Sequence, residues 1–244
     1  MGTQESEIET FKRLITQTYP TGIVSIVSDT WDFWKVITKY TVTLKNDILN
    51  RQENTLGLAK VVFRPDSGDP IKIIAGDPDA KPNTPEFKGA VECLWDIFGG
   101  TETSKGYKLL NQRVGLIYGD SITLERAKTI LSRLKAKGFA STNIVLGIGS
   151  YTYQYITRDS FGFAMKATWG QVAGQGREIS KDPVTDSGEK KSAVGLLRVE
   201  KTANGFQLFD RQTPQQEKAG ALEVVFNNGK LIKEISLADI RAIL

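Results

Sequence analysis

Four short apolar segments recur along the first 150 residues, and each one stops abruptly at glycine and polar residues. They lie at residues 23–27, 60–63, 114–118 and 143–146. Short, nearly continuous apolar runs are typical of strands that are buried on both faces, as in a parallel sheet. Because α/β proteins place their chemistry at the carboxyl ends of strands, the polar residues that follow these runs are the first candidates for a site.

The segments between the predicted strands have the pattern of helices. Residues 5–18 form an amphipathic stripe, Asp29 and Thr30 can cap a second helix, Thr84 precedes a third that continues to Phe98, and Thr123 precedes a fourth. Strands that alternate with helices indicate parallel pairing through right-handed crossovers. We therefore expect an α/β fold, a partial (half) TIM-like parallel barrel of βα units.

The pattern changes near residue 160. A strand is expected at residues 161–169, two more flank a turn at residues 203–204, and residues 222–232 contain a hairpin signal, Asn-Asn-Gly. A short final helix follows Ser236. This predicts two parts, a half barrel over residues 1–160 and an antiparallel β-rich C-terminal part over residues 161–244.

The amino-acid composition limits the kinds of catalytic and binding groups that the chain can supply. The chain has 244 residues, a net charge of +4 from 32 basic and 28 acidic side chains, and no histidine. A histidine base, a histidine-dependent triad and a histidine metal site are therefore excluded within this chain. The one cysteine, Cys93, has the apolar surroundings of a core position and fits a cytoplasmic protein. We expect neither a nucleic-acid partner nor a membrane segment.

The loop after the second predicted strand, Arg-Pro-Asp-Ser-Gly at residues 64–68, is the densest polar cluster. Arg64 could stack on a planar ring or bind phosphate in a bidentate way, and Asp66 could accept two sugar hydroxyls. A turn held by a structural Arg–Asp pair explains the same residues.

The later strand ends carry similar groups. Asp120, after Gly119, could bind ribose hydroxyls or Mg²⁺, or could simply favour a helix N-terminus. Backbone amides at residues 147–150 could meet a phosphate, with Arg158 and Lys166 following closely. The polar loop around residues 181–186 suits either function or disorder. Together these groups predict a sugar-phosphate site without selecting a reaction.

Several of these segments, taken in order, resemble the nicotinamide phosphoribosyltransferases, which are type II phosphoribosyltransferases. The resemblance covers essentially the whole chain, and no single motif decides it. The segments that carry it lie at residues 26–32, 64–68, 104–108, 118–120, 157–159, 181–183 and 226–230.

The resemblance implies a pentosyltransferase that forms nicotinamide mononucleotide and pyrophosphate from nicotinamide and phosphoribosyl pyrophosphate, with Mg²⁺, in NAD biosynthesis. It also implies an irregular α/β barrel with a β-rich domain, and a homodimer with shared sites. The residues that it assigns to binding or catalysis are Ser25 and Arg64 at nicotinamide, Asp29, Asp66 and Asp120 at ribose or Mg²⁺, Gly119 beside Asp120, Gly149 and Ser150 at the 5′-phosphate, and Arg158, Lys166 and Lys181 at phosphate or pyrophosphate. Catalysis is expected from Asp29, Arg64 and Asp66, which would position and stabilise an oxocarbenium-like transition state.

Members of this family are much longer than this chain, so the resemblance covers a C-terminal portion only. The part not represented holds other barrel strands, much of the nicotinamide pocket and a histidine phosphorylated by ATP in a Glu-His-Ser motif, which would lie just before Met1. We therefore expect little turnover from this chain alone. Alternatives are a non-catalytic or split subunit that pairs with another chain, and a relative that uses nicotinate.

Overall fold

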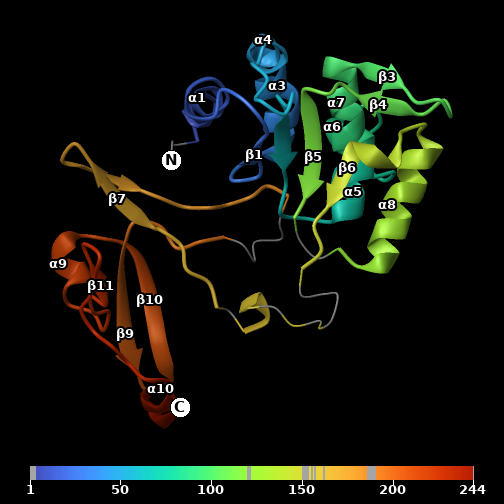
Figure 1. Ribbon diagram of the computed structural model, residues 1–244. Helices are drawn as coiled ribbons and strands as arrows, with labels where there is room; N and C mark the ends of the chain where they lie inside the picture. The colour runs from blue at the N-terminus through green and yellow to red at the C-terminus, as the bar shows by residue number, and fades with distance from the viewer. Residues whose placement is uncertain are drawn as a thin grey trace. The chain divides into compact units, whose positions relative to one another are not determined.

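A four-stranded parallel sheet forms the centre of the first of two units into which the chain divides (Figure 1). The computed structural model describes residues 4–119, 122–149, 154, 156, 158–161, 163–185 and 191–243. The first unit comprises Met1–Met165 and Lys181–Lys191, and the second comprises Lys166–Ser180 and Ser192–Leu244. Each unit is described by itself below.

The strand order in the sheet is β1-β2-β5-β6, and every neighbouring pair is parallel. The expectation of an α/β fold with a parallel sheet is thereby confirmed, and the four apolar runs supply its strands. The bounds are β1 (Val24–Val27), β2 (Val61–Arg64), β5 (Val114–Tyr118) and β6 (Ile144–Leu146).

The two faces of this sheet differ in burial. On one face, side chains such as Ile26, Phe63 and Leu116 are almost fully buried in the hydrophobic core. On the other face, Val27 is 39% exposed and Val145 is 58% exposed. Parallel sheets are normally covered on both faces, so this sheet presents one face that the described residues leave largely open.

The remaining elements of this unit are short helices and one hairpin. The hairpin pairs β3 (Gly100–Glu102) with β4 (Lys108–Leu110) in antiparallel fashion. The helices are α1 (Glu7–Arg13), α2 (Phe33–Lys35), α3 (Thr41–Thr43), α4 (Lys45–Leu49), α5 (Pro70–Ala75), α6 (Pro85–Lys88), α7 (Ala90–Phe98) and α8 (Leu124–Ala136), with π-helical turns η1 (Leu14–Thr18) and η2 (Val36–Tyr40) and 3₁₀ turns η3 (Ser141–Asn143) and η5 (Arg158–Phe161).

Two helix predictions are corrected. The helix expected from Thr84 to Phe98 is divided into α6 and α7 by Gly89, whose φ is +82°. A Cβ on Gly89 would lie 2.3 Å from the backbone nitrogen of Gly76, so the break allows two backbone segments to approach closely. The helix after β1 is capped by Asp32, whose Oδ1 accepts from the Lys35 amide at 3.1 Å, and neither Asp29 nor Thr30 is its cap.

The segment between η1 and β1 is held by one buried guanidinium. Arg51, only 5% exposed, donates to the carbonyl oxygens of Tyr19 at 2.7 Å and Gly22 at 3.0 Å. It also donates to the carbonyls of Ile15 and Thr21. The contacts with Ile15 and Tyr19 satisfy carbonyls at the end of η1 that the helix leaves without partners.

The second unit is built from antiparallel hairpins, as expected for the C-terminal part. Across both units, none of the described helices is long and apolar enough to cross a membrane. The strand predicted at residues 161–169 is wrong, since β7 begins only at Trp169 and turns at Ala173 and Gly174, both at positive φ. Ser236 does cap the last helix, because its Oγ accepts from the Asp239 amide. The bounds are β7 (Trp169–Val172), β8 (Gln175–Glu178), β9 (Leu196–Thr202), β10 (Gly205–Gln212), α9 (Pro214–Glu217), β11 (Phe226–Asn227), β12 (Lys230–Leu231) and α10 (Leu237–Ile243).

Candidate functional site

The carboxyl ends of β1 and β2 are joined by the polar residues that follow them. Val27 pairs with Arg64 in the parallel register, and the Ser28 amide donates to the Arg64 carbonyl at 3.0 Å. The fully buried Ser28 hydroxyl donates back to Ile26 and accepts from the Arg64 amide at 3.2 Å. The two strand ends are therefore fixed side by side before their loops begin.

Asp29 is the buried centre of this edge. Its carboxylate is fully buried, and Oδ2 accepts from the Asp66 amide at 2.9 Å and from Ser67 Oγ at 2.5 Å. The other oxygen, Oδ1, is buried and has no hydrogen-bond partner among the described residues. One oxygen of Asp29 thus holds the loop at residues 64–68 by hydrogen bonds, while the described residues supply no hydrogen-bond partner for the other.

The end of β5 completes the same edge. Tyr118 donates its hydroxyl to the Gly68 carbonyl at 2.8 Å. A Cβ on Gly119 would lie 2.8 Å from Nε of Arg64, so the guanidinium rests directly against the glycine backbone. Glycine leaves room for this approach, which brings the side chain of Arg64, the last residue of β2, against the end of β5.

A segment from far along the chain covers these loops. The Val184 amide donates to the Trp31 carbonyl at 2.9 Å, and Thr185 Oγ1 lies 2.5 Å from Ser67 Oγ. Thr185 also presents its carbonyl to Gly68, where a Cβ would lie 2.5 Å from that oxygen. The structure thus shows where this polar loop is attached to the loops after β1 and β2, which the sequence did not reveal.

A pocket of about 400 Å³ lies beside this segment. Val184, Thr185 and Trp34 form part of its wall, together with several acidic side chains. Two of those acids are already used locally, because Asp69 Oδ1 caps α5 and Asp77 forms a 3.0 Å ion pair with Lys72. These two acids therefore stabilise the local structure around the pocket.

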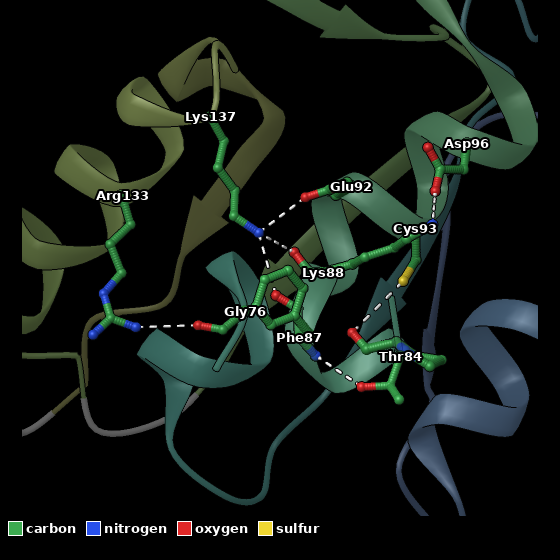
Figure 2. Close-up of polar contacts among 10 residues, drawn as sticks. Gly76, Thr84, Phe87, Lys88, Glu92, Cys93, Asp96, Arg133 and Lys137 are labelled. Atoms are coloured by element: carbon green, nitrogen blue, oxygen red, sulfur yellow. Dashed lines mark hydrogen bonds and ion pairs between the residues drawn. The ribbon is translucent and has the colours of Figure 1, made fainter. Parts of the chain in front are cut away.

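The helices behind the sheet are locked by cationic side chains, as Figure 2 shows. Lys137, at the end of α8, donates to the Lys88 carbonyl at 2.7 Å and pairs with Glu92 at 2.9 Å. Arg133 donates to the Gly76 carbonyl at 3.1 Å. Both cations thereby bind carbonyls at the ends of short helices, which stabilises the layer that carries the strand-end loops.

Two buried titratable groups lie outside this edge. Burial raises the pKa of the Cys93 thiol to about 12, so the thiolate needed for reactivity is scarce at neutral pH and the predicted core role is confirmed. Burial also raises the pKa of the Glu7 carboxyl, while a hydrogen bond with Tyr40 and the charge of Lys35 act in the opposite direction. Cys93 lies on α7, whereas Glu7 is close enough to the loop after β1 for the negative charges of Asp32 and Asp29 to raise its pKa further.

The structure brings together four of the predicted site residues, Asp29, Arg64, Asp66 and Gly119. Ser25 lies on the exposed side of β1, and Gly149 follows β6. Lys181 belongs to the first unit, while Lys166 belongs to the second. Asp120 and Ser150 lie outside the described residues, and of Arg158 only the backbone is described, at the start of η5.

Magnesium was expected at Asp29 and Asp120. Within the described ranges no group of three or more His, Cys, Asp or Glu side chains could hold a metal ion. Mg²⁺ is commonly held by one or two carboxylates together with water and substrate phosphates. The buried, unpartnered Oδ1 of Asp29 is an oxygen donor of the kind that such an ion takes.

Sequence comparison places these contacts in a wider context. The model of the nicotinate phosphoribosyltransferase (NAPRTase) family matches residues 2–230. The chain is 68% identical to a nicotinamide phosphoribosyltransferase of Acinetobacter baylyi, over 99% of this chain and 48% of that protein. Similar enzymes from Mycoplasma pneumoniae and Xanthomonas campestris are 42% and 32% identical, over 79% and 98% of this chain and 41% and 48% of their own lengths. The chain thus spans about half the length of these curated relatives.

Proposed function

The chain belongs to the nicotinate phosphoribosyltransferase (NAPRTase) family, and on this premise we propose that it is the C-terminal portion of a nicotinamide phosphoribosyltransferase. The reaction joins nicotinamide to phosphoribosyl pyrophosphate and yields nicotinamide mononucleotide and pyrophosphate. The relatives at 68% and 42% identity both carry the nicotinamide name, which favours nicotinamide over nicotinate as the base.

One observation carries the proposal. Residues that are far apart in sequence, at the ends of three parallel strands, converge on a single edge around Asp29, Arg64 and Asp66. They present a planar cation, backbone amides and carboxylates together, which is the set of groups needed to hold a ring, a sugar and phosphates. Strand carboxyl ends are also where α/β folds bind such ligands.

The roles follow from the chemistry of each group. Arg64 stacks on the nicotinamide ring, which Ser25 also faces, and Asp66 accepts the ribose hydroxyls. Asp29 fixes the Asp66 backbone and so orients that carboxylate toward the sugar. Positive charge develops on the ribose as the bond to pyrophosphate breaks, and carboxylates held in place beforehand stabilise it without reorganisation.

Other groups bind the charged ends of the substrate. Amides at Gly149 and Ser150 meet the 5′-phosphate, while Arg158, Lys166 and Lys181 bind phosphate or pyrophosphate. Mg²⁺, when bound, would neutralise pyrophosphate charge, with Asp29 Oδ1 and Asp120, beside Gly119, as its protein ligands. ATP coupling belongs to the histidine-bearing half of the full-length enzyme.

The open sheet face indicates what the chain requires to act. Parallel sheets bury both faces, yet Val27 and Val145 remain exposed here, and β1 and β6 are both edge strands. The proposal is that the sheet is half of a TIM-like barrel, closed in the cytoplasm by the remaining half or a partner chain. The complete enzyme is proposed to be a homodimer.

Reconstitution tests this proposal. The 244-residue chain is mixed with the part of the A. baylyi relative that it does not match, and nicotinamide mononucleotide is measured after addition of both substrates and Mg²⁺. Product is expected from the mixture and not from either chain alone, with nicotinate as a competing substrate that distinguishes the base. A mixture carrying Arg64→Ala is the matched control. A mixture that binds phosphoribosyl pyrophosphate without forming product would indicate a non-catalytic subunit instead.

A further inference from the structure

Three oxygen-bearing side chains form a continuous chain beneath the loop at residues 64–68. Thr185 Oγ1 lies 2.5 Å from Ser67 Oγ, and Ser67 Oγ donates to Asp29 Oδ2 at 2.5 Å. Because the Ser67 proton is given to the carboxylate, Thr185 is the donor to Ser67. The same Oδ2 accepts from the Asp66 amide at 2.9 Å, so three successive hydrogen bonds connect Thr185 to the backbone of Asp66.

Other described contacts also hold the segment around Val184 and Thr185. Pro183 is buried, and the Val184 amide donates to the Trp31 carbonyl at 2.9 Å. The Val184 side chain, in contrast, is 66% exposed, and the pocket of about 400 Å³ lies next to both Val184 and Thr185. Polar contacts thus attach the segment, and the Thr185 hydroxyl makes a side-chain contact with the loop at residues 64–68 beside the backbone contact at Gly68.

A close backbone contact fixes the point at which the segment around Thr185 meets the loop at residues 64–68. Gly68 has a φ of +81°, and a Cβ there would lie 2.5 Å from the Thr185 carbonyl oxygen. The two backbones are thus in direct contact at the point where the hydroxyls meet. Lys181 lies four residues before Thr185, which limits the distance between their Cα atoms to about 14 Å.

We propose that Thr185 is a positioning residue: its hydroxyl fastens the segment at residues 181–185 to Ser67, so that Lys181 and Asp66 are presented together to phosphoribosyl pyrophosphate. This inference rests on the proposed function. Thr185 touches no reacting atom and acts through the Ser67–Asp29 contact. An ordinary surface contact would contribute only to stability, whereas a positioning contact also changes the affinity for this one substrate.

The test removes the hydroxyl and keeps the shape. Thr185→Val retains the branched side chain, Thr185→Ser retains the hydroxyl, and Thr129→Val removes an exposed hydroxyl bond on α8 as the matched control. Hydrogen exchange of the Val184 and Asp66 amides reports the attachment in the 244-residue chain. Calorimetry with phosphoribosyl pyrophosphate and Mg²⁺ reports affinity, and the reconstituted mixture reports KM for each substrate.

Thr185→Val is expected to speed exchange at both amides and to weaken phosphoribosyl pyrophosphate binding about three- to tenfold, the effect of one hydrogen bond. KM for nicotinamide and the melting temperature should change little, and Thr185→Ser and Thr129→Val should remain within about twofold of the wild type. Adding Thr185→Val to Ser67→Ala should give no further loss, because both remove the same contact.

The outcomes separate the two hypotheses. If the wild-type chain binds phosphoribosyl pyrophosphate and Thr185→Val binds it equally well, or if Thr185→Ser fails like Thr185→Val, the positioning role is wrong while the proposed function stands. Unchanged amide exchange in Thr185→Val overturns the attachment itself. A wild-type chain that neither binds phosphoribosyl pyrophosphate nor supports turnover in the mixture overturns the proposed function, and the positioning role with it.

Discussion

Replacing Asp29 separates its structural contacts from its proposed ligand role. In Asp29→Ala the partly buried Asp66 amide and the buried Ser67 hydroxyl both lose their acceptor. Each buried donor without a partner costs about 1–3 kcal/mol, so the variant should lose about 2–6 kcal/mol of the free energy of unfolding.

Asp29→Asn should behave differently. Its amide oxygen can accept from both donors, although bonds to a neutral acceptor are weaker by about 1 kcal/mol each. The amide nitrogen would then occupy the place of Oδ1, to which no described group donates. Removing a buried charge offsets the weaker bonds, so the free energy of unfolding should stay within about 2 kcal/mol of the wild type.

Urea unfolding measures this difference. A Trp169→Phe background leaves Trp31, Trp34 and Trp95, which all belong to the first unit, so that fluorescence reports that unit alone. The matched control is Asp79→Asn, which changes an exposed acid in the same unit. Because Asp29→Asn stays folded, its Mg²⁺-dependent affinity for phosphoribosyl pyrophosphate can be measured directly and should fall.

The reasoning would be refuted if Asp29→Asn lost as much stability as Asp29→Ala, because Oδ1 would then have a partner that the asparagine amide repels. An unchanged affinity of Asp29→Asn for phosphoribosyl pyrophosphate would remove Asp29 from the proposed metal site and leave it as a support for the loop.

Three further predictions concern groups away from the strand ends. Glu7→Gln should stabilise the chain increasingly as pH rises above 4.5, because burial raises the pKa of Glu7 and the folded state loses stability when that carboxyl ionises; thermal melts from pH 4 to 7 test this, with Glu9→Gln, a change of an exposed acid on the same helix, as the comparison variant, and a Glu7→Gln effect independent of pH would contradict it. Cys93, with a pKa raised to about 12, should resist a maleimide at pH 7.5 until urea unfolds the chain, and rapid labelling of folded protein would contradict its buried state. Gly89→Ala should lower the melting temperature far more than Gly99→Ala, since both have positive φ but only Gly89 faces backbone atoms within 4 Å; equal losses would mean that the close approach is unimportant.

The sequence predicted the parallel strands well, because continuous apolar runs are a local signal. The run at residues 114–118 coincides with β5, and the run at residues 143–146 begins one residue before β6. Helix ends were predicted where the cap is local, as at Thr123, whose hydroxyl accepts from the Arg126 amide at 3.3 Å.

Predictions failed where a distant partner decides the structure. Asp29 was expected to cap a helix, but its Oδ2 instead accepts hydrogen bonds from a loop that begins 37 residues later. Gly89 ends a helix that an amphipathic pattern would continue, since it must make room for the backbone at Gly76. The hairpin at Ala173 and Gly174 has weak alternation on either side, so the apolar residues before it attracted the strand prediction instead.

For the candidate site, the sequence singled out particular loops but did not show how they are connected. The loop at residues 64–68 and Gly119 were recognised from their composition, and the contact between Arg64 and Gly119 was not. The attachment of Thr185 to Ser67 spans 118 residues and involves side chains that are common in any turn. Such a pairing leaves no local pattern and becomes visible only in three dimensions.

The buried guanidinium of Arg51 has a consequence for the order in which the chain acquires structure during synthesis. All four carbonyls that it binds lie between Ile15 and Gly22, so everything needed for this contact has been made once residue 51 has left the ribosome. Closing a loop of this length costs little entropy compared with the long-range pairing that follows. The contacts of Arg51 with residues 15–22 can thus form before β2 has been synthesised. β1 would then already be held near its final position when its partner strand β2 leaves the ribosome.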